Sequence, residues 1–63
     1  MTKRVRIENA DATAFRVVVQ LWERTRDGRP DMLVSEVRLV NPCDITEQTI
    51  HSDRYLIVAE VPL

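Results

Sequence analysis

The chain has 63 residues, a formal net charge of −1 and a hydrophobic fraction of 44%. A chain of this length forms one domain at most and hides only about 60% of its unfolded surface, near the lower limit for independent stability. One cysteine excludes an internal disulfide, and one histidine with one cysteine cannot by themselves make a four-ligand zinc site. The balanced charge disfavours purely electrostatic binding of nucleic acid or anionic lipid. Unusually good packing or association with other chains is therefore expected.

Alternation of apolar and charged residues predicts the first strand. Eighteen residues are Val, Ile or Thr, which is a strand-rich composition, and Gly28 is the single glycine. From Lys3 to Glu8, Val5 and Ile7 alternate with charged residues, which predicts a half-buried strand. The polar residues and small alanines from Asn9 to Thr13 predict a connection.

The longest alternation runs from Ala14 to Arg24. One of its faces is apolar from Phe15 to Leu21 and predicts a core contribution from Phe15, Val17, Val19 and Leu21. The other face is mixed, because Val18 and Trp22 lie among Arg16, Gln20 and Arg24. This mixture predicts that the second face covers a neighbour or lies at an interface.

Turn residues from Thr25 to Asp31 predict a hairpin loop longer than two residues. A two-residue turn at Asp27 and Gly28 would place Pro30 inside the returning strand, where its missing N–H is costly. The returning strand is expected over Met32–Val40, with Leu33, Val37 and Leu39 on one face and Met32, Val34 and Val40 on the other. Asn41 and Pro42 end it.

The segment from Cys43 to Ile50 fits two structures. Asp44 and Glu47 have the spacing of a helix capping box, and the opposite parity of Ile45 and Ile50 suggests a bulge or a turn of helix. Its β-branched residues favour a strand, which is the interpretation we prefer.

A turn at Ser52–Arg54 leads to a closing strand over Tyr55–Val61. That strand is apolar on both faces, as is typical of a central strand or one covered by a partner. The fold expected is all-β, a single domain over residues 1–63, built as a small antiparallel β-sandwich or partly open barrel of about five strands. Its sheet edges offer places where other chains can add on.

No residue type or spacing predicts catalysis. We expect Cys43 to be a small buried hydrophobe and His51 to be an exposed turn residue. Ser35, Ser52 and the acids Asp44 and Glu47 lack a nucleophile elbow, a zinc-binding H-E-x-x-H or a second histidine. A non-enzymatic protein is therefore expected, with no catalytic residue, cofactor or metal ligand. No apolar run reaches the roughly 18 residues of a membrane span and no signal peptide is recognisable, so synthesis in a cytoplasm is expected.

Arginine, which is favoured at interfaces, outnumbers lysine eight to one. The three arginines of the segment from Glu23 to Asp31 are balanced by three acids, whereas Lys3, Arg4 and Arg6 form a denser basic stripe. This stripe suits an acidic partner or nucleic acid, or is simply the solvated face of the first strand. The candidate partner-binding residues are Trp22, Val18, Met32, Arg24, Arg26, Arg29, Lys3, Arg4 and Arg6.

Three stretches resemble small phage-encoded proteins. They read K-R-V-R-I-E-N at 3–9, F-R-V-V-V-Q-L-W at 15–22, and from Asn41-Pro42 through Ile50-His51 to R-Y-L-I-V at 54–58. The third looks like a pattern of compact β-sandwich modules, although Cys43 stands where such modules usually carry glycine. The resemblance implies a virion accessory or decoration protein that binds capsid subunits.

Three functional hypotheses follow. The first is a structural or interaction protein of a phage virion, acting through sheet faces and edges on capsid or other virion subunits or on further copies of itself. The second is a small barrel that binds nucleic acid through its basic residues and Trp22. The third is an inhibitor that docks its Thr25–Asp31 loop on a host enzyme.

Overall fold

The computed structural model describes residues 2–11 and 14–62, which form five strands and no helix. The strands are β1 (Lys3–Glu8), β2 (Phe15–Glu23), β3 (Met32–Leu39), β4 (Ile45–Ile50) and β5 (Arg54–Pro62). The expected all-β class is confirmed, including a strand in the ambiguous segment before His51. Among the described residues, none belongs to a helix that could cross a membrane.

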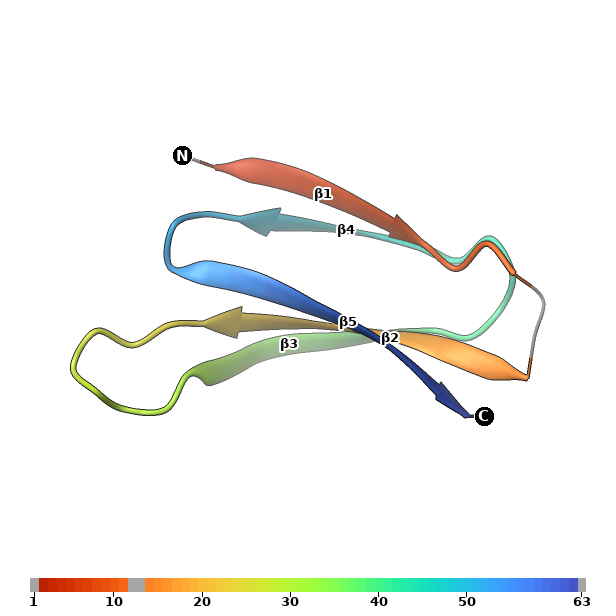
Figure 1. The fold of residues 1–63 in the computed structure, drawn as a ribbon. Coiled ribbons are helices and arrows are strands. Elements are labelled where there is room, and N and C mark those ends of the chain that lie inside the picture. The colour runs from red at the N-terminus through yellow and green to blue at the C-terminus, as the bar shows by residue number, and fades with distance from the viewer. Residues whose placement is uncertain (1, 12–13, 63) are drawn as a thin grey trace.

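Two antiparallel sheets make up the fold. β1 pairs with β4, and β2 lies between β3 and β5 in a three-stranded sheet (Figure 1). The two-stranded sheet packs on one side of the three-stranded sheet, and the strands do not close into a barrel. The Cα atoms span 41 × 23 × 11 Å, so the molecule is thin. We call the side of the three-stranded sheet that faces β1 and β4 the inner face, and the opposite side the outer face.

The core lies on the inner face and is small. Among the described residues, the buried hydrophobic side chains are Val19, Leu21 and Leu39, and Val19 on the central strand is only 1% exposed. Along β1 and β4 exposed and half-buried positions alternate, and the half-buried ones point toward this core. Val19 and Leu21 thus lie where the alternation of β2 predicts. Phe15, at the start of the same strand, is exposed, so its expected core position is wrong.

A β-bulge in β3 changes which of its residues face the core. Trp22 pairs with Leu33, one residue out of step with the preceding pairs, so Val34 is the extra residue. Directly paired residues point to the same side of a sheet, and Leu33 therefore lies beside Trp22 on the outer face, 48% exposed. The expected grouping of Leu33 with Val37 and Leu39 is wrong.

The chain between β3 and β4 forms a tight turn at Asn41–Asp44. The Asp44 N–H donates to the Asn41 carbonyl (3.1 Å), and the Asp44 carboxylate accepts from the Asn41 N–H (2.9 Å). Pro42 at the second position and a φ of 69° for Cys43 at the third indicate a type II turn. Cys43 is exposed, so the expectation that it is buried is wrong. Asp44 caps this turn and not a helix.

Replacement of Cys43 by glycine is expected to stabilise the protein by about 1 kcal/mol. A side chain with a Cβ is strained in the left-handed region, whereas glycine adopts it freely. Urea denaturation of Cys43→Gly measures the gain. Cys43→Ala is the matched control, because it removes the thiol but keeps the Cβ and should leave stability within about 0.5 kcal/mol of the parent. Equal stabilities of the two variants would contradict the strained turn.

Asn9 joins the two sheets at one end of the molecule. Its side chain is 5% exposed and its Nδ2 donates to the carbonyl oxygens of Leu39 (3.0 Å) and Asn41 (3.4 Å). Its backbone N–H donates to the Asp44 carbonyl (2.9 Å) and its carbonyl accepts from the Cys43 N–H (2.7 Å). The ends of β1 and β3 and the start of β4 are therefore held by one buried residue.

Candidate functional site

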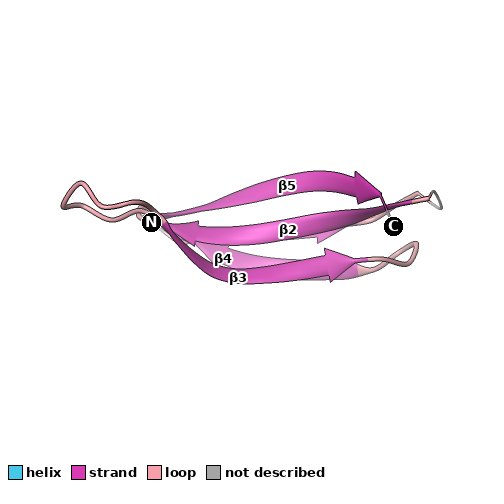
Figure 2. Ribbon diagram, turned by 90° about the horizontal axis from the view of Figure 1, so that it is seen from below, coloured by secondary structure: helices cyan, strands magenta, loops and turns pink. Residues whose placement is uncertain are grey.

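The outer face of the three-stranded sheet is the candidate site. β1 and β4 cover the inner face only, and Figure 2 looks toward the outer face along which β5, β2 and β3 lie. The strand registers place three columns of side chains there: Arg16, Val18, Gln20 and Trp22 from β2, Leu33, Glu36 and Arg38 from β3, and Tyr55, Ile57, Ala59 and Val61 from β5. This is the mixed face that the alternation of β2 predicts.

A shallow hollow of about 270 Å³ lies on this face. Its apolar side comes from Val18 and three residues of β5, and its polar side comes from β2 and β3. The eight lining residues are Arg16, Val18, Gln20, Glu36, Arg38, Ile57, Ala59 and Val61. An extended or looped segment of a partner protein could bind here, with apolar side chains against the apolar strip and polar groups against the polar row.

The polar row is a chain of hydrogen bonds across β2 and β3. The Trp22 Nε1–H donates to Gln20 Oε1 (3.0 Å), the Gln20 Nε2 donates to Glu36 Oε1 (2.9 Å), and Arg38 Nη2 donates to Glu36 Oε2 (3.4 Å). The hydrogen bond from Gln20 is the main cause that lowers the pKa of Glu36; the charges of Arg38 and Arg16 add to it and desolvation opposes it. Glu36 is therefore held as a carboxylate, and the row fixes the indole of Trp22.

Arg16 carries an unused hydrogen-bond donor. Among the described residues, its Nε is the one buried side-chain nitrogen or oxygen without a hydrogen-bond partner. A buried donor without an acceptor costs about 1–3 kcal/mol. Arg16 also lines the hollow, so its charged guanidinium can meet an oxygen acceptor on a docked partner.

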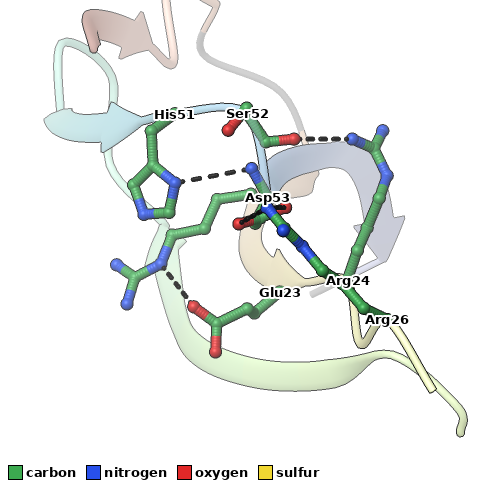
Figure 3. A network of polar contacts seen from close by, with 7 residues as sticks. Glu23, Arg24, Arg26, His51, Ser52 and Asp53 are labelled. Atoms are coloured by element: carbon green, nitrogen blue, oxygen red, sulfur yellow. Dashed lines mark hydrogen bonds and ion pairs between the residues drawn. The ribbon is translucent and has the colours of Figure 1, made fainter. Parts of the chain in front are cut away.

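A second polar cluster ties the long loop after β2 to the turn between β4 and β5 (Figure 3). Arg26 Nη2 contacts both carboxylate oxygens of Asp53 (3.1 and 3.0 Å), and Arg24 Nη1 donates to the Ser52 carbonyl (3.2 Å). His51 Nδ1 accepts from the Asp53 N–H (3.4 Å). Arg24 and Arg26 therefore hold the loop after β2 against the turn between β4 and β5.

Tyr55 is held at the same end by Asp31 and Arg24. Its hydroxyl donates to Asp31 Oδ2 (2.7 Å), and the Arg24 guanidinium lies 5.0 Å from its ring centroid. The hydrogen bond to Asp31 is the main cause that raises the pKa of Tyr55, with desolvation and the charge of Asp31 adding to it. This contact brings the end of the loop onto β5.

The tyrosine titration tests this contact directly, because Tyr55 is the only tyrosine. Its phenolate absorbance should give a pKa above the ordinary value, and Asp31→Asn should lower that pKa toward it. Since the folded-state pKa exceeds the unfolded one, the contact stabilises below about pH 10 and is lost as the pH rises through the folded-state value. Asp27→Asn, in the same loop, is the control and should leave the titration unchanged; an equal shift in both variants would contradict the contact.

Most of the predicted basic residues are paired with acids. Arg4 and Arg6 share Glu47, with Arg6 Nη2 at 2.8 Å from Oε1, and Arg29 Nε lies 3.1 Å from Asp27. Six of the eight arginines form such pairs: Arg4, Arg6, Arg26, Arg29, Arg38 and Arg54. Lys3 lies at the exposed start of β1. This local neutralisation disfavours a basic patch for nucleic acid.

The structure brings only some of the predicted partner-binding residues together. Val18 and Trp22 share the outer face, whereas Met32 pairs with Glu23 and so points to the inner side, 59% exposed. Sequence reasoning did not single out Arg16, Glu36, Arg38 or Ile57 as site residues. Arg16 alternates in step with Val18 and Trp22 on the same strand, which the sequence shows. That Glu36, Arg38 and Ile57 lie beside them is shown only by the strand registers.

The described residues show no candidate metal site. In residues 2–11 and 14–62, no group of three or more His, Cys, Asp or Glu side chains lies close enough to hold a metal ion. Comparison with models of protein families, with curated proteins and with solved structures finds no match to this chain. The functional argument therefore rests on the geometry of the outer face.

Proposed function

We propose that this chain is a non-enzymatic interaction protein that docks a protein partner on its outer face. The observation that carries the proposal is the hollow in which the apolar strip of β5 lies beside the charged and polar side chains of Arg16, Glu36 and Arg38. A partner segment with apolar side chains and an oxygen acceptor, either a carboxylate or a backbone carbonyl, matches both features. Docking would pair the Arg16 guanidinium with that acceptor and remove the apolar strip from water.

The amount of exposed surface supports association. The chain exposes 4671 Å², about 500 Å² more than the roughly 4,200 Å² expected for a compact chain of this mass. Against three buried hydrophobic side chains, eight large ones are exposed in the described part of the chain: Phe15, Met32, Leu33, Val34, Val40, Ile45, Ile57 and Val58. Burial of part of this surface on a partner compensates for the small internal core.

The partner proposed is a capsid or other virion subunit, with this chain as a virion accessory protein that decorates or stabilises the shell. The resemblance to small phage-encoded β-sandwich modules supports this role. A thin module with one uncovered sheet face suits attachment to a larger particle. The proposed activity is binding alone, so the affinity for the shell is the quantity to measure.

Replacement of Arg16 by methionine is expected to separate stability from binding. The change removes the unpartnered donor, so the free energy of unfolding of the free chain should stay equal or rise by about 1 kcal/mol. Affinity for purified capsid shells should fall at least about tenfold, because the partner's acceptor loses its donor. Trp22, the only tryptophan, lies on the docking face, and its fluorescence reports the binding.

Arg4→Met is the matched control, because Arg4 lies on the other sheet and is paired with Glu47. It should bind shells as the parent does. Equal binding by Arg16→Met would contradict docking on the outer face. The virion role predicts that the gene lies in a phage genome and that mass spectrometry finds the chain in purified virions of that phage; absence of the chain from these particles would contradict it. Retention on DNA that falls steeply with salt would instead favour the nucleic-acid alternative.

A further inference from the structure

The unpaired edge of β5 is a second exposed feature of the fold, distinct from the outer face. β5 pairs with β2 on one side, and no described strand lies along its other side. In Figure 2 it forms one margin of the molecule. A nine-residue strand with one unpaired edge presents a row of backbone N–H and C=O groups to a further strand.

Exposure along β5 indicates an edge contact. Ile57 is 43% exposed and its neighbour Val58 is 53% exposed, although they point to opposite faces of the sheet. A partner on either face would cover only one of them. A strand added along the edge brings side chains beside both, because its own residues alternate in the same way.

The other edge strands carry charges that discourage such pairing. β1 contains Lys3, Arg4, Arg6 and Glu8, β3 contains Glu36 and Arg38, and β4 contains Glu47. β5 has no charged residue from Tyr55 to Ala59, and its charges, Arg54 and Glu60, stand at the two ends of that apolar run. Charged side chains on edge strands are a common protection against strand addition, and the middle of β5 lacks it.

We propose that β5 pairs antiparallel with β5 of a second copy, with the two-fold axis at Ile57. The sequence R-Y-L-I-V-A-E over 54–60 is self-complementary in this register. Each Arg54 lies opposite the other copy's Glu60, and the apolar residues between them pair with one another. Opposite charges across an antiparallel pair stabilise it, and this register supplies two such pairs by symmetry.

The pairing has a structural consequence for the docking face. It joins the two three-stranded sheets into one of six strands in the order β3-β2-β5-β5-β2-β3. Directly paired residues of antiparallel strands point to the same side of the sheet. The two outer faces would therefore form one continuous surface, and both β1–β4 sheets would lie on the opposite side. Arg54 already contacts Glu23 of its own chain through Nε (3.2 Å), so the proposed pair with the second Glu60 would use its Nη atoms.

This inference goes beyond the proposed function, because it adds a second copy of the chain as a partner at the edge of β5. Sedimentation equilibrium of the purified full chain, without shells, should show a monomer–dimer equilibrium. Val58→Lys places a charge in the middle of the edge and should raise the dimer dissociation constant at least about tenfold. Val34→Lys, the same change on β3, is the matched control and should leave the constant unchanged, since both side chains are exposed in the parent.

A charge exchange tests the register. Arg54→Glu or Glu60→Arg alone places like charges opposite each other and should raise the dissociation constant about tenfold, whereas the double variant Arg54→Glu/Glu60→Arg should restore it. A monomer at every concentration would overturn the proposal, and so would a dimer that is insensitive to Val58→Lys. The two variants report on the two surfaces separately. Val58→Lys should lose dimerisation and keep shell binding, whereas Arg16→Met should lose shell binding and keep dimerisation.

Discussion

Leu39→Ala is expected to lower the free energy of unfolding by about 3 kcal/mol. Leu39 is one of the three buried hydrophobic side chains of the described chain, and it ends β3 beside the junction that Asn9 makes. So small a core has few other side chains that could move to fill the space left by the leucine. Urea denaturation followed by Trp22 fluorescence measures the loss, which is a large part of the stability of a 63-residue domain.

The matched control is Ile45→Ala. Ile45 is a large hydrophobic residue at the start of β4 and is 52% exposed. Its truncation should cost less than about 1 kcal/mol, because little apolar surface returns to water and no closed cavity forms. Similar losses for the two variants would mean that the inner face is not the main core.

Asn9→Ala is expected to cost about 2–3 kcal/mol. The change removes the Nδ2 donor from two carbonyl oxygens, and the buried Leu39 carbonyl would lose this side-chain partner. The hydrogen bonds from the backbone of Asn9 remain possible, so the loss isolates the side chain. Thermal and urea denaturation of the variant give its magnitude.

Asn9→Asp is a stricter test, because aspartate has the same shape. At neutral pH its carboxylate faces two carbonyl oxygens, so the loss should equal or exceed that of Asn9→Ala. Protonation restores a donor, and the carboxyl should have a raised folded-state pKa. Stability should therefore recover as the pH falls through that value toward about pH 4. A stable aspartate variant at neutral pH would contradict the proposed role of Asn9.

The strands and turns could be predicted because their signals are local. Alternation with a period of two marks β1 and β2, and Pro30, Pro42 and Gly28 lie in the connections where the chain reverses. The bulge at Val34 could not be predicted, since one extra residue in a strand leaves no mark in composition. The exposure of Cys43 could not be predicted either, because it results from the position of this residue in the turn and not from its apolar character.

The outer face was only partly predictable. Val18 and Trp22 stand out because they interrupt a polar face, but the row from Trp22 to Arg38 depends on the registers of two strand pairs. The sequence also does not show which arginines are paired with acids, because these pairs form between strands that are far apart in the chain. Arg16, which lacks a hydrogen-bond partner at Nε, could therefore not be distinguished from the paired arginines.

The place of β5 in the sheet decides between two explanations of its apolar character. Apolar residues on both faces predict either a central strand or one covered by a partner. The strand order places β5 at the edge of its sheet, which removes the first explanation for the described chain. Exposure of the neighbouring Ile57 and Val58 favours the second.

The central claim is that association stabilises this fold, and the dependence of its unfolding on protein concentration tests that claim most directly. A chain that binds a second copy when folded but not when unfolded gains about 2.7 kcal/mol of apparent stability when its free concentration reaches about 100 times the dissociation constant. The account predicts that the urea midpoint, followed by Trp22 fluorescence, rises steadily across about a hundredfold range of concentration around that constant. A midpoint that stays the same over the whole range would contradict it.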